Sequence, residues 1–524
     1  MAEQPQFRRR DFVKLLGLLG VAAAVPIVAT SIRQQSFWSN PFRLGVASGA
    51  PAEDGFVLWT RLVSTQLSET ESVVVDWELF DEADPEEVIQ QGQAIALAEL
   101  AHSVHVEVAG LAPDQWYGYR FRVAGYQSQQ GRARTLPVAT AAVTSMRFAF
   151  ASCQRYEDGY YAAYRHMRQQ QPDFVCFVGD YIYEYGSRAG APRPHTLRRI
   201  RDLQGYRERY ALYKSDPDLQ AMHAQCPWLV TWDDHEVENN YFSAQSTEGR
   251  GDISTLRAAA YQAFYEHMPL RASSLIEGIE GLIKHGCLQL YQSYDFAGLA
   301  RFYLLDNRQY RAEPLCGESP SDGIAAVCND DSKEYRTMLG SAQERWLAQE
   351  FATKSASGQQ WHFVVQQTRF TPANYHVGQG NNFNRDSWDG YPAAREQLLS
   401  SMRQSKHKNM MVIGGDIHQN WVARVHADPY NVESEVVATE FTGTSITSRS
   451  RATPAGMRRH LRRNPHLAYA NAAYRGYGLV DISAAKVQVT LYAVDAIEQP
   501  DSSVSVLAKF EVPSGQPAAL KQLL

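Results

Sequence analysis

The chain has 524 residues, enough for a large core and for more than one domain. Its hydrophobic content of 44% and charged content of 21% are ordinary for a soluble globular protein. The formal net charge of −6, without a basic stripe that dominates the chain, gives no sign of a nucleic-acid partner.

The first 32 residues are predicted to be an export signal rather than part of the fold. Residues 8–10 are arginines, Phe12 and Lys14 follow, and residues 15–29 are rich in Ala, Leu and Gly. This order resembles a twin-arginine (Tat) signal. A single membrane anchor is the alternative, but the apolar run is shorter than the ~20 residues that span a bilayer. We therefore expect cleavage, export to the periplasm or the medium through the Tat machinery, and no stable membrane span.

Six cysteines occur, and an exported protein can form disulfides. Cys316 and Cys328 flank a loop rich in Gly, Ser, Pro and Asp, and they are the predicted pair. Cys176 lies inside an apolar strand and is expected to be a small buried hydrophobic residue. Cys153 differs, because it stands at the end of a strand beside polar residues.

Residues 40–137 predict a small β-sandwich domain. Apolar runs alternate with turn signals at the spacing of a sandwich. Residues 111–120 look like the turn and strand of a fibronectin-type domain. The expected strands are residues 45–51, 56–62, 72–80, 102–108 and 117–125.

Residues 145–512 predict a layered α/β domain, because strand-like runs alternate with helical stretches. The helices expected there are residues 197–213, 255–267 and 341–351. Two further strands, 478–482 and 487–494, precede a polar C-terminal tail over residues 513–524.

The stretch 146–185 carries the first candidate site residues. It predicts a strand, a helix and a second strand, with Cys153 after the first strand and Asp180 after the second. Tyr183 follows three residues later. Ligands of open α/β sheets bind at the carboxyl ends of strands, so these three side chains are expected in one cleft.

Further apolar runs of the same domain also stop at polar clusters. Several strand ends that carry Asp, His, Asn, Arg, Cys and Tyr predict a polynuclear metal site with cations nearby for an anion. The clusters are residues 233–240, 306–308, 367–369 and 416–420.

Seven blocks occur in order: SCQ (152–154), GDYIYEYG (179–186), WDDHEVENNY (232–241), DNRQYR (306–311), QQTRF (366–370), WDGYP (388–392) and GGDIHQNW (414–421). Together they resemble the PhoD family of alkaline phosphatases/phosphodiesterases. LGVASGAP (44–51) and VLWTRL (57–62) resemble the N-terminal domain of that family. The resemblance covers the chain from about residue 42 nearly to its end.

The resemblance implies an α/β fold, the four-layer calcineurin-like metallophosphatase sandwich, preceded by a fibronectin/Ig-like β-sandwich. It also implies a metal-dependent phosphoric ester hydrolase in which metal-bound water or oxide attacks a phosphate ester. The broader superfamily pattern has D-x-H where Cys153 stands and a carboxylate where Tyr183 stands. The implied cofactors are Fe³⁺, held by a thiolate and a phenolate, and one or two Ca²⁺.

The ligand chemistry agrees with that implication. Cys and Tyr anions suit Fe³⁺, whereas Asp and Asn oxygens suit Ca²⁺. Asp233 is a weaker candidate than its neighbour, because adjacent residues of an extended chain point apart. The implied iron ligands are Cys153, Asp180, Tyr183 and His418, with Asp180 as a bridge; Asp234 and Asn239 are calcium candidates, and Asp416 can join either side.

Two residues are the catalytic candidates, each with a plainer alternative. His235 is expected to face the phosphate or to act as a general acid, unless it is a satisfied core histidine. Arg369 is the preferred phosphate clamp, through bidentate contacts. Arg155, Arg308 and Arg369 could instead form surface ion pairs. Trp388 and Tyr391 could line the substrate mouth or simply pack.

Two rival functions remain open. One is a phospholipase D-like hydrolase of phospholipid headgroups, which requires an apolar rim at the cleft. The other is a noncatalytic, calcium-dependent surface scaffold that works through its β-sandwich. The scaffold is disfavoured, because every ligand block is present.

Overall fold

The structure is a computed structural model. It describes residues 31–32, 36–195, 198–315, 317, 323–326, 335–352, 359–376, 380–405 and 407–524. The predicted signal, apart from residues 31–32, and the predicted Cys316–Cys328 pair lie outside the described residues. In the part of the chain that is described, no helix is long and apolar enough to cross a membrane.

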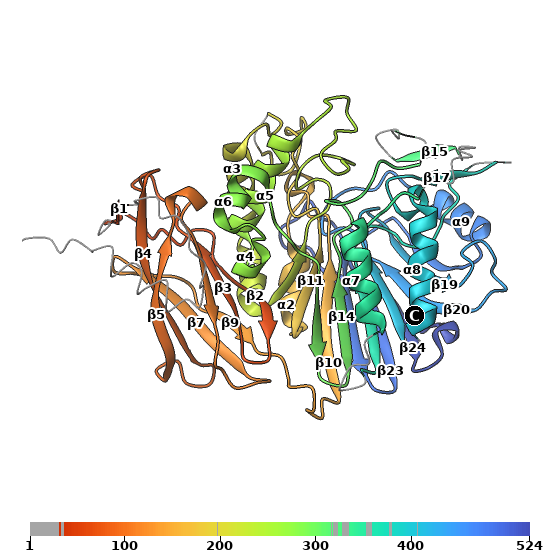
Figure 1. The fold of residues 1–524 in the computed structure, drawn as a ribbon, viewed down its shortest axis with the longest axis horizontal. Coiled ribbons are helices and arrows are strands. Elements are labelled where there is room, and N and C mark those ends of the chain that lie inside the picture. Colours follow the sequence, from red (N-terminus) through yellow and green to blue (C-terminus); the bar gives the residue numbers. More distant parts are fainter. Residues whose placement is uncertain are drawn as a thin grey trace, which may run out of the picture.

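A large sheet forms the centre of the molecule and continues into its N-terminal part (Figure 1). Its middle strands are parallel, and antiparallel strands flank them at both ends. In spatial order it contains β25 (Lys521–Gln522), β24 (Val504–Pro513), β23 (Lys486–Val494), β22 (Arg475–Ser483), β10 (Ser145–Ala151), β11 (Phe174–Val178), β12 (Trp228–Thr231), β2 (Val46–Ala52), β3 (Gly55–Arg61) and β6 (Ser103–Val108).

A second sheet faces the middle of the first. Its strands β14, β16, β18 and β20 are mutually parallel. In spatial order it contains β13 (Gln292–Phe296), β14 (Ala300–Leu304), β16 (Trp361–Val365), β18 (Met410–Gly414), β20 (Val436–Thr442), β19 (Asn420–His426) and β21 (Leu467–Asn471).

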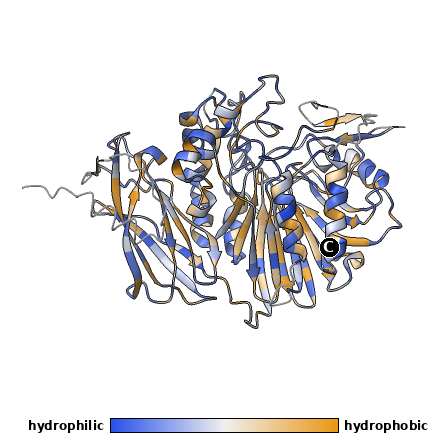
Figure 2. Cartoon of the chain, viewed as in Figure 1, coloured by the Kyte–Doolittle hydropathy of each residue, from blue (hydrophilic) through white to orange (hydrophobic). Residues whose placement is uncertain are grey.

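Aromatic side chains fill the space between these two sheets. Phe148 and Phe174 from the first sheet meet Phe302 and Phe363 from the second, and all four are buried. The ring centroid of Phe148 lies 5.1 Å from that of Phe302 and 5.3 Å from that of Phe363. Each such pair contributes about 1 kcal/mol beyond the area it buries. Figure 2 shows the strands of this region coloured as predominantly hydrophobic.

Helices cover the outer faces of both sheets, which gives the predicted four-layer order (Figure 1). The helix predicted over residues 197–213 begins only at Leu203, because the Asp202 side chain caps it by accepting from the Gly205 N–H. Helices α2 (Ala162–Gln169), α3 (Leu203–Lys214), α4 (Pro217–Gln225) and α5 (Ser254–His267) pack on the larger sheet, and α7 (Gly340–Ala352) and α8 (Pro392–Ser405) on the smaller.

The N-terminal sandwich is made of a separate sheet that packs on β2, β3 and β6. These three strands also extend the large sheet, since Gly49 of β2 pairs with Trp228 of β12. Strand β5 was not predicted, because its sequence VIQQGQAIA is polar in its middle. The separate sheet contains β1 (Ser31–Ile32), β4 (Glu71–Asp81), β5 (Val88–Ala96), β7 (Trp116–Val123), β8 (Tyr126–Gln127) and β9 (Gly131–Arg134).

Smaller elements complete the described chain. Residues 513–524, predicted as a polar tail, return to the edge of the large sheet, where β25 pairs with β24. The remaining α-helices and strands are α6 (Gly278–His285), α9 (Pro454–Arg463) and the antiparallel pair β15 (Ile324–Ala326) and β17 (Asn382–Asn384).

Candidate metal centre

The loops that follow the parallel strands meet at one edge of the two sheets. Four of their side chains stand on backbone with positive φ: Cys153 (57°), Asp180 (57°), Asp416 (68°) and His418 (54°). Residues other than glycine rarely adopt this region, and such strained positions cluster at functional sites. The loops after β10 and β11 are joined by hydrogen bonds from Cys153 N to Gly179 O and from Gln154 N to Asp180 O.

Glycine allows two of these loops to come close. A Cβ on Gly179, whose φ is +100°, would lie 2.4 Å from Asp233 Cβ. A Cβ on Gly415 would lie 2.5 Å from Ser152 Oγ. Both distances are too short for real atoms, so only glycine lets the ligand-bearing loops approach this closely.

A buried carboxylate joins the loops after β11 and β12. Glu236 accepts hydrogen bonds from the backbone N–H groups of Asp180, Tyr181 and Asp233. Burial, followed by the charge of Asp180, raises the pKa of Glu236 to about 8. One side chain therefore holds the backbone of both loops, a role that was not predicted for Glu236.

The four predicted iron ligands come together. Donor atoms of Cys153, Asp180 and His418 lie within 4.8 Å of one another. The Tyr183 hydroxyl donates to Asp180 Oδ2 at 2.7 Å and lies 3.2 Å from His418 Nε2. His418 Nδ1 lies 3.1 Å from the Arg449 carbonyl oxygen, so Nδ1 carries the hydrogen and Nε2 keeps a free lone pair. This donor set fits a bound metal ion.

Ser448 supports this group and was not predicted. Its Oγ lies 2.7 Å from the Tyr183 hydroxyl and 2.7 Å from the Cys153 carbonyl oxygen. It belongs to the loop after β20, where the sequence TSITSRS offers several similar hydroxyl residues. No sequence signal separates Ser448 from them.

A second group consists of carboxylates. Donor oxygens of Asp233, Asp234 and Asp416 lie within 4.8 Å of one another, and those of Asp180 and Asp234 approach His235 equally closely. Asp180 and Asp234 therefore link the two groups. The expectation that Asp233 and Asp234 point apart is wrong, because both follow the end of β12 and are not in extended strand.

This carboxylate group fits a bound cation. Asp233 Oδ2 and Asp234 Oδ1 are buried and have no hydrogen-bond partner among the described residues. Burial raises the pKa of Asp233 and of Asp416 well above the usual range, and neighbouring carboxylates add to this despite Arg308. A divalent cation would offset the repulsion, and an all-oxygen donor set suits Ca²⁺.

Arg308 is inside the centre rather than on the surface. Its Nε donates to Asp233, and Nη1 donates to both oxygens of Asp386 at 2.8 and 2.7 Å. Its Nη2 lies 3.7 Å from Asp234 and 3.5 Å from Asp416. Asp386 was not predicted, because it precedes the recognised WDGYP block and follows no strand of the sheet.

Asn239 lies in the turn that closes on Asp234. The N–H of the next residue, Asn240, donates to Asp234 Oδ2 at 2.6 Å, and the N–H of Asn239 donates to Glu184 Oε1 at 3.1 Å. The structure thus places the turn that carries Asn239 beside the carboxylate group.

His235 is held in a fixed orientation beside the centre. Its Nδ1 lies 2.7 Å from Glu184 Oε2, and its ring centroid lies 4.2 Å from that of Tyr183. Burial lowers the pKa of His235, but Glu184, Asp234 and Asp180 outweigh burial and raise it to about 10. Glu184 was not predicted as a partner, although it stands within the GDYIYEYG block.

The Arg369 guanidinium is held by hydrogen bonds to neighbouring residues. It is fully buried, Nε donates to Thr371 O at 2.7 Å, Nη2 donates to Asp389 Oδ2, and Nη1 to the Tyr375 hydroxyl. Arg395 also binds Asp389, because its Nη1 donates to Asp389 Oδ1 at 2.6 Å. The structure therefore does not bring Arg369 into the carboxylate group.

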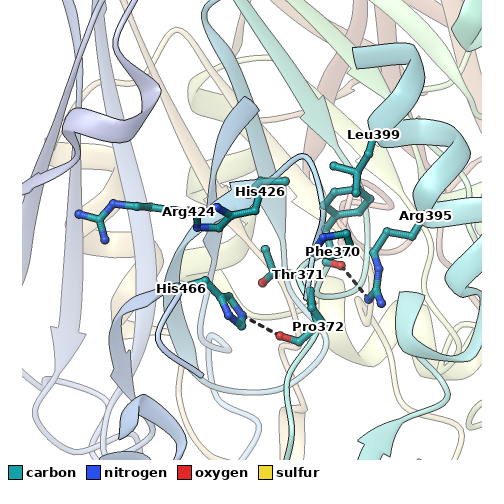
Figure 3. A pocket seen from close by; sticks show the side chains of 10 residues that line it. Phe370, Thr371, Pro372, Arg395, Leu399, Arg424, His426 and His466 are labelled. Carbon is teal, nitrogen blue, oxygen red and sulfur yellow. Dashed lines mark hydrogen bonds between the residues drawn. The ribbon is translucent and has the colours of Figure 1, made fainter. Parts of the chain in front are cut away.

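A small cavity lies beside residues 370–372, which directly follow Arg369 (Figure 3). Arg395 and His466 point toward it from either side, and their side chains bond the carbonyl oxygens of Phe370 and Pro372. Its volume of about 10 Å³ admits one water molecule at most, so it is not a substrate site. Trp388 and Tyr391 are buried in the adjacent core.

Comparison with known proteins decides the family. The model of "PhoD-like phosphatase" matches residues 148–491, and that of "PhoD-like phosphatase, N-terminal domain" matches residues 28–137. The chain is 39% identical over 523 residues to alkaline phosphatase D of Bacillus subtilis (strain 168), covering 96% of this chain and 87% of that protein. The chain belongs to the PhoD-like phosphatase family.

Solved structures agree with this assignment. The chain is similar to a solved structure of PhoD with a TM-score of 0.86 and 39% identity, over 94% of this chain and 93% of that one. A purple acid phosphatase from yellow lupin (Lupinus luteus) shares the fold at 11% identity, with a TM-score of 0.52 over 89% and 74% of the two chains. This PhoD-like phosphatase is a metal-dependent phosphoric ester hydrolase with a metallophosphatase fold.

Proposed function

We propose that this chain is an exported phosphodiesterase and phosphomonoesterase whose centre holds one Fe³⁺ and one or two Ca²⁺. One observation carries the proposal: a thiol, a phenol, an imidazole and carboxylates converge at one strand edge, with Asp180 shared between two donor groups. Mixed soft and hard donors that meet at a shared carboxylate are what two different metals require.

The residues divide by donor chemistry. Burial, followed by the nearby Asp180, raises the pKa of both Cys153 and Tyr183 well above the usual range. Only a strongly bound cation makes such buried groups anionic donors. The iron side is Cys153, Asp180, Tyr183 and His418, and the calcium side is Asp233, Asp234 and Asp416 with Asn239 of the adjoining turn.

When bound, the metal ions supply an activated water and neutralise charge on the phosphoryl oxygens. The residues of the chain position the catalytic groups and donate a proton to the leaving group. Glu184 holds His235 through Nδ1, which fixes the ring beside Tyr183 and directs its other nitrogen away from Glu184. We assign His235 to the leaving-group oxygen, as a proton donor.

Arg308 and Arg369 have different roles. Arg308 holds Asp233 and Asp386 in place, and its Nη2 remains directed at Asp234 and Asp416. A phosphate contact by Arg369 stays a prediction, and it requires Tyr375 or Asp389 to release the guanidinium. Export rests on the arginines at 8–10 and the apolar run 15–29, which lie outside the described residues.

Hydrolysis of bis-(p-nitrophenyl) phosphate by the purified mature protein tests the proposal. Activity should be lost to a chelator and restored when Ca²⁺ is added back. A protein loaded with iron and calcium that releases no nitrophenol would contradict a general diesterase and favour a narrow substrate such as a phospholipid. The Asp180→Asn variant should be inactive, because the iron side loses a donor that also links it to Asp234 and His235.

A further inference from the structure

Helix α9 lies beside the metal centre. The loop that leads into it passes the centre, since the Arg449 carbonyl oxygen is bonded by His418 Nδ1. Leu461 of α9 and Ile417, which stands between two ligands, pack on the same apolar cluster around Trp421. Trp421 follows His418 by three residues, a distance of about 10 Å along an extended chain.

This part of the chain carries an unusual charge. Acidic residues make up 57 of the 524 residues, yet none occurs between Glu440 and Asp481. That interval contains seven arginines and no lysine. The overall charge of −6 conceals this local excess. The arginines are Arg449, Arg451, Arg458, Arg459, Arg462, Arg463 and Arg475, and all but Arg475 are exposed.

The arginines of α9 share its outer face. Met457 is buried, His460 contacts the Tyr375 and Trp421 rings, and Leu461 packs inward, so Arg458, Arg459, Arg462 and Arg463 point to solvent. Figure 1 shows α9 at the outer side of the smaller sheet, where it packs beside the edge strand β21.

Most of these charges are not neutralised. Arg449 pairs with Glu498, but Arg451, Arg458, Arg459 and Arg462 form no ion pair with any described residue. Like charges four residues apart on a helix repel each other and destabilise it. The helix dipole compensates only in the last turn. A contribution to the stability of the fold therefore does not explain why these arginines are present.

We propose that the arginine face, defined as Arg451, Arg458, Arg459 and Arg462, binds further phosphates of a substrate that carries several phosphodiester groups along one chain. This rests on the proposed function, because the centre would hydrolyse one phosphate while the face holds others. Arginine binds phosphate through paired N–H groups, and positions 458 and 462 are spaced by about 6 Å along the helix.

The exposed surface of α9 favours a soluble polyanion over a lipid surface. No large apolar side chain of α9 is exposed, since Met457 is buried and Leu461 is partly covered. A helix that binds at a membrane interface inserts large apolar side chains between the lipids. The face instead offers charge alone, which is the usual means of holding a phosphodiester backbone.

Binding of a fluorescent, abasic phosphorothioate oligomer tests this face directly. The oligomer is a linear phosphodiester-like polyanion without bases, it resists hydrolysis, and anisotropy at fixed Ca²⁺ reports its affinity. The variant Arg458→Gln, Arg459→Gln and Arg462→Gln should bind at least about tenfold more weakly, and the slope of log affinity against log salt should fall by about 2–3.

The matched control removes the same charge elsewhere. Arg168, Arg345 and Arg403 are exposed arginines on α2, α7 and α8, and their triple change to Gln should alter affinity less than twofold. Equal losses in the two variants, no loss in the α9 variant, or no binding by the wild type would each overturn the proposal. Anionic vesicles bound in place of the oligomer would also overturn it and assign the face to lipid.

A small substrate separates this proposal from the function of the centre. The α9 variant should hydrolyse bis-(p-nitrophenyl) phosphate with kcat/KM within about twofold of the wild type, because that ester has one phosphate. A wild type that binds the oligomer but hydrolyses no ester would contradict the proposed function and leave the binding face supported.

Discussion

At the residue scale, the centre is organised around a few side chains that each serve several neighbours. The Tyr183 hydroxyl is shared by Asp180, His418 and Ser448. Removing one such atom leaves several buried partners unsatisfied, which costs more than one hydrogen bond. Variants at these positions should therefore lower both the metal content and the stability of the protein.

Tyr183→Phe should lose the phenolate ligand while leaving the ring in place. We expect the iron content of the purified protein to fall and any visible absorption from phenolate-to-iron charge transfer to disappear. Tyr185→Phe is the control, because among the described residues the hydrogen bond of the Tyr185 hydroxyl is a long one to Glu248, at 3.5 Å. An unchanged spectrum and unchanged iron in Tyr183→Phe would remove Tyr183 from the iron side.

His235→Asn tests proton donation to the leaving group. A poor leaving group needs the proton, so kcat for an alkyl phosphodiester should fall by about 10²–10⁴, and kcat for a nitrophenyl ester by about tenfold or less. Glu184→Gln should show the same trend more weakly, because it loosens the ring. His285→Asn, an exposed change on α6, should leave kcat for both esters unchanged. Equal losses for both esters would assign His235 a structural role.

Sequence patterns found most of the centre at this scale and missed part of it. Cys153, Asp180, Asp234 and His418 stand directly at strand ends, so the pattern of apolar runs placed them together. Two missed partners stand inside recognised blocks without a pattern that marks their role, and two enter from loops far along the chain. The missed partners are Glu184, Glu236, Asp386 and Ser448.

At the scale of elements, the centre depends on short loops that turn sharply after each strand. Gly179 has a φ of +100° and lies against the Asp233 backbone. The β11 and β12 loops therefore adopt their positions together, tied by Glu236.

Gly179→Ala should lower the free energy of unfolding by more than about 3 kcal/mol, since a Cβ strains the backbone and collides with Asp233. Metal content should fall as well. Gly190→Ala is the matched control: its φ is +72°, but nothing lies within 4 Å, so about 1 kcal/mol is expected. Denaturant unfolding of the two variants gives both values. Equal costs would mean that the close approach is not needed.

At the scale of the whole molecule, the N-terminal sandwich and the phosphatase region share a buried contact. The Lys214 ammonium lies 4.2 Å from the centre of the Trp59 ring of β3 and 5.3 Å from that of Tyr181. Sequence could predict the sandwich, but pairing of Gly49 with Trp228 joins segments far apart in the chain and carries no sequence signal.

Lys214 should make stability depend on pH. Burial lowers its pKa well below 10.5, so the unfolded chain binds more protons between the folded and unfolded pKa values, and stability rises with pH through that window. Lys214→Met should raise the free energy of unfolding at pH 7 by roughly 1–4 kcal/mol and flatten this rise. Exposed Lys284→Met should keep the slope. A variant less stable at every pH would show that the aromatic rings favour the charged ammonium.

The central claim is that iron and calcium occupy the two donor groups that Asp180 and Asp234 link. X-ray data from a crystal of the purified protein, collected above and below the iron absorption edge, test it most directly. We expect one anomalous peak within bonding distance of Cys153, Asp180, Tyr183 and His418, and a second, iron-free peak among Asp233, Asp234 and Asp416. A crystal of active protein with no iron peak at Cys153 and Tyr183, or with iron among the aspartates, would contradict the account.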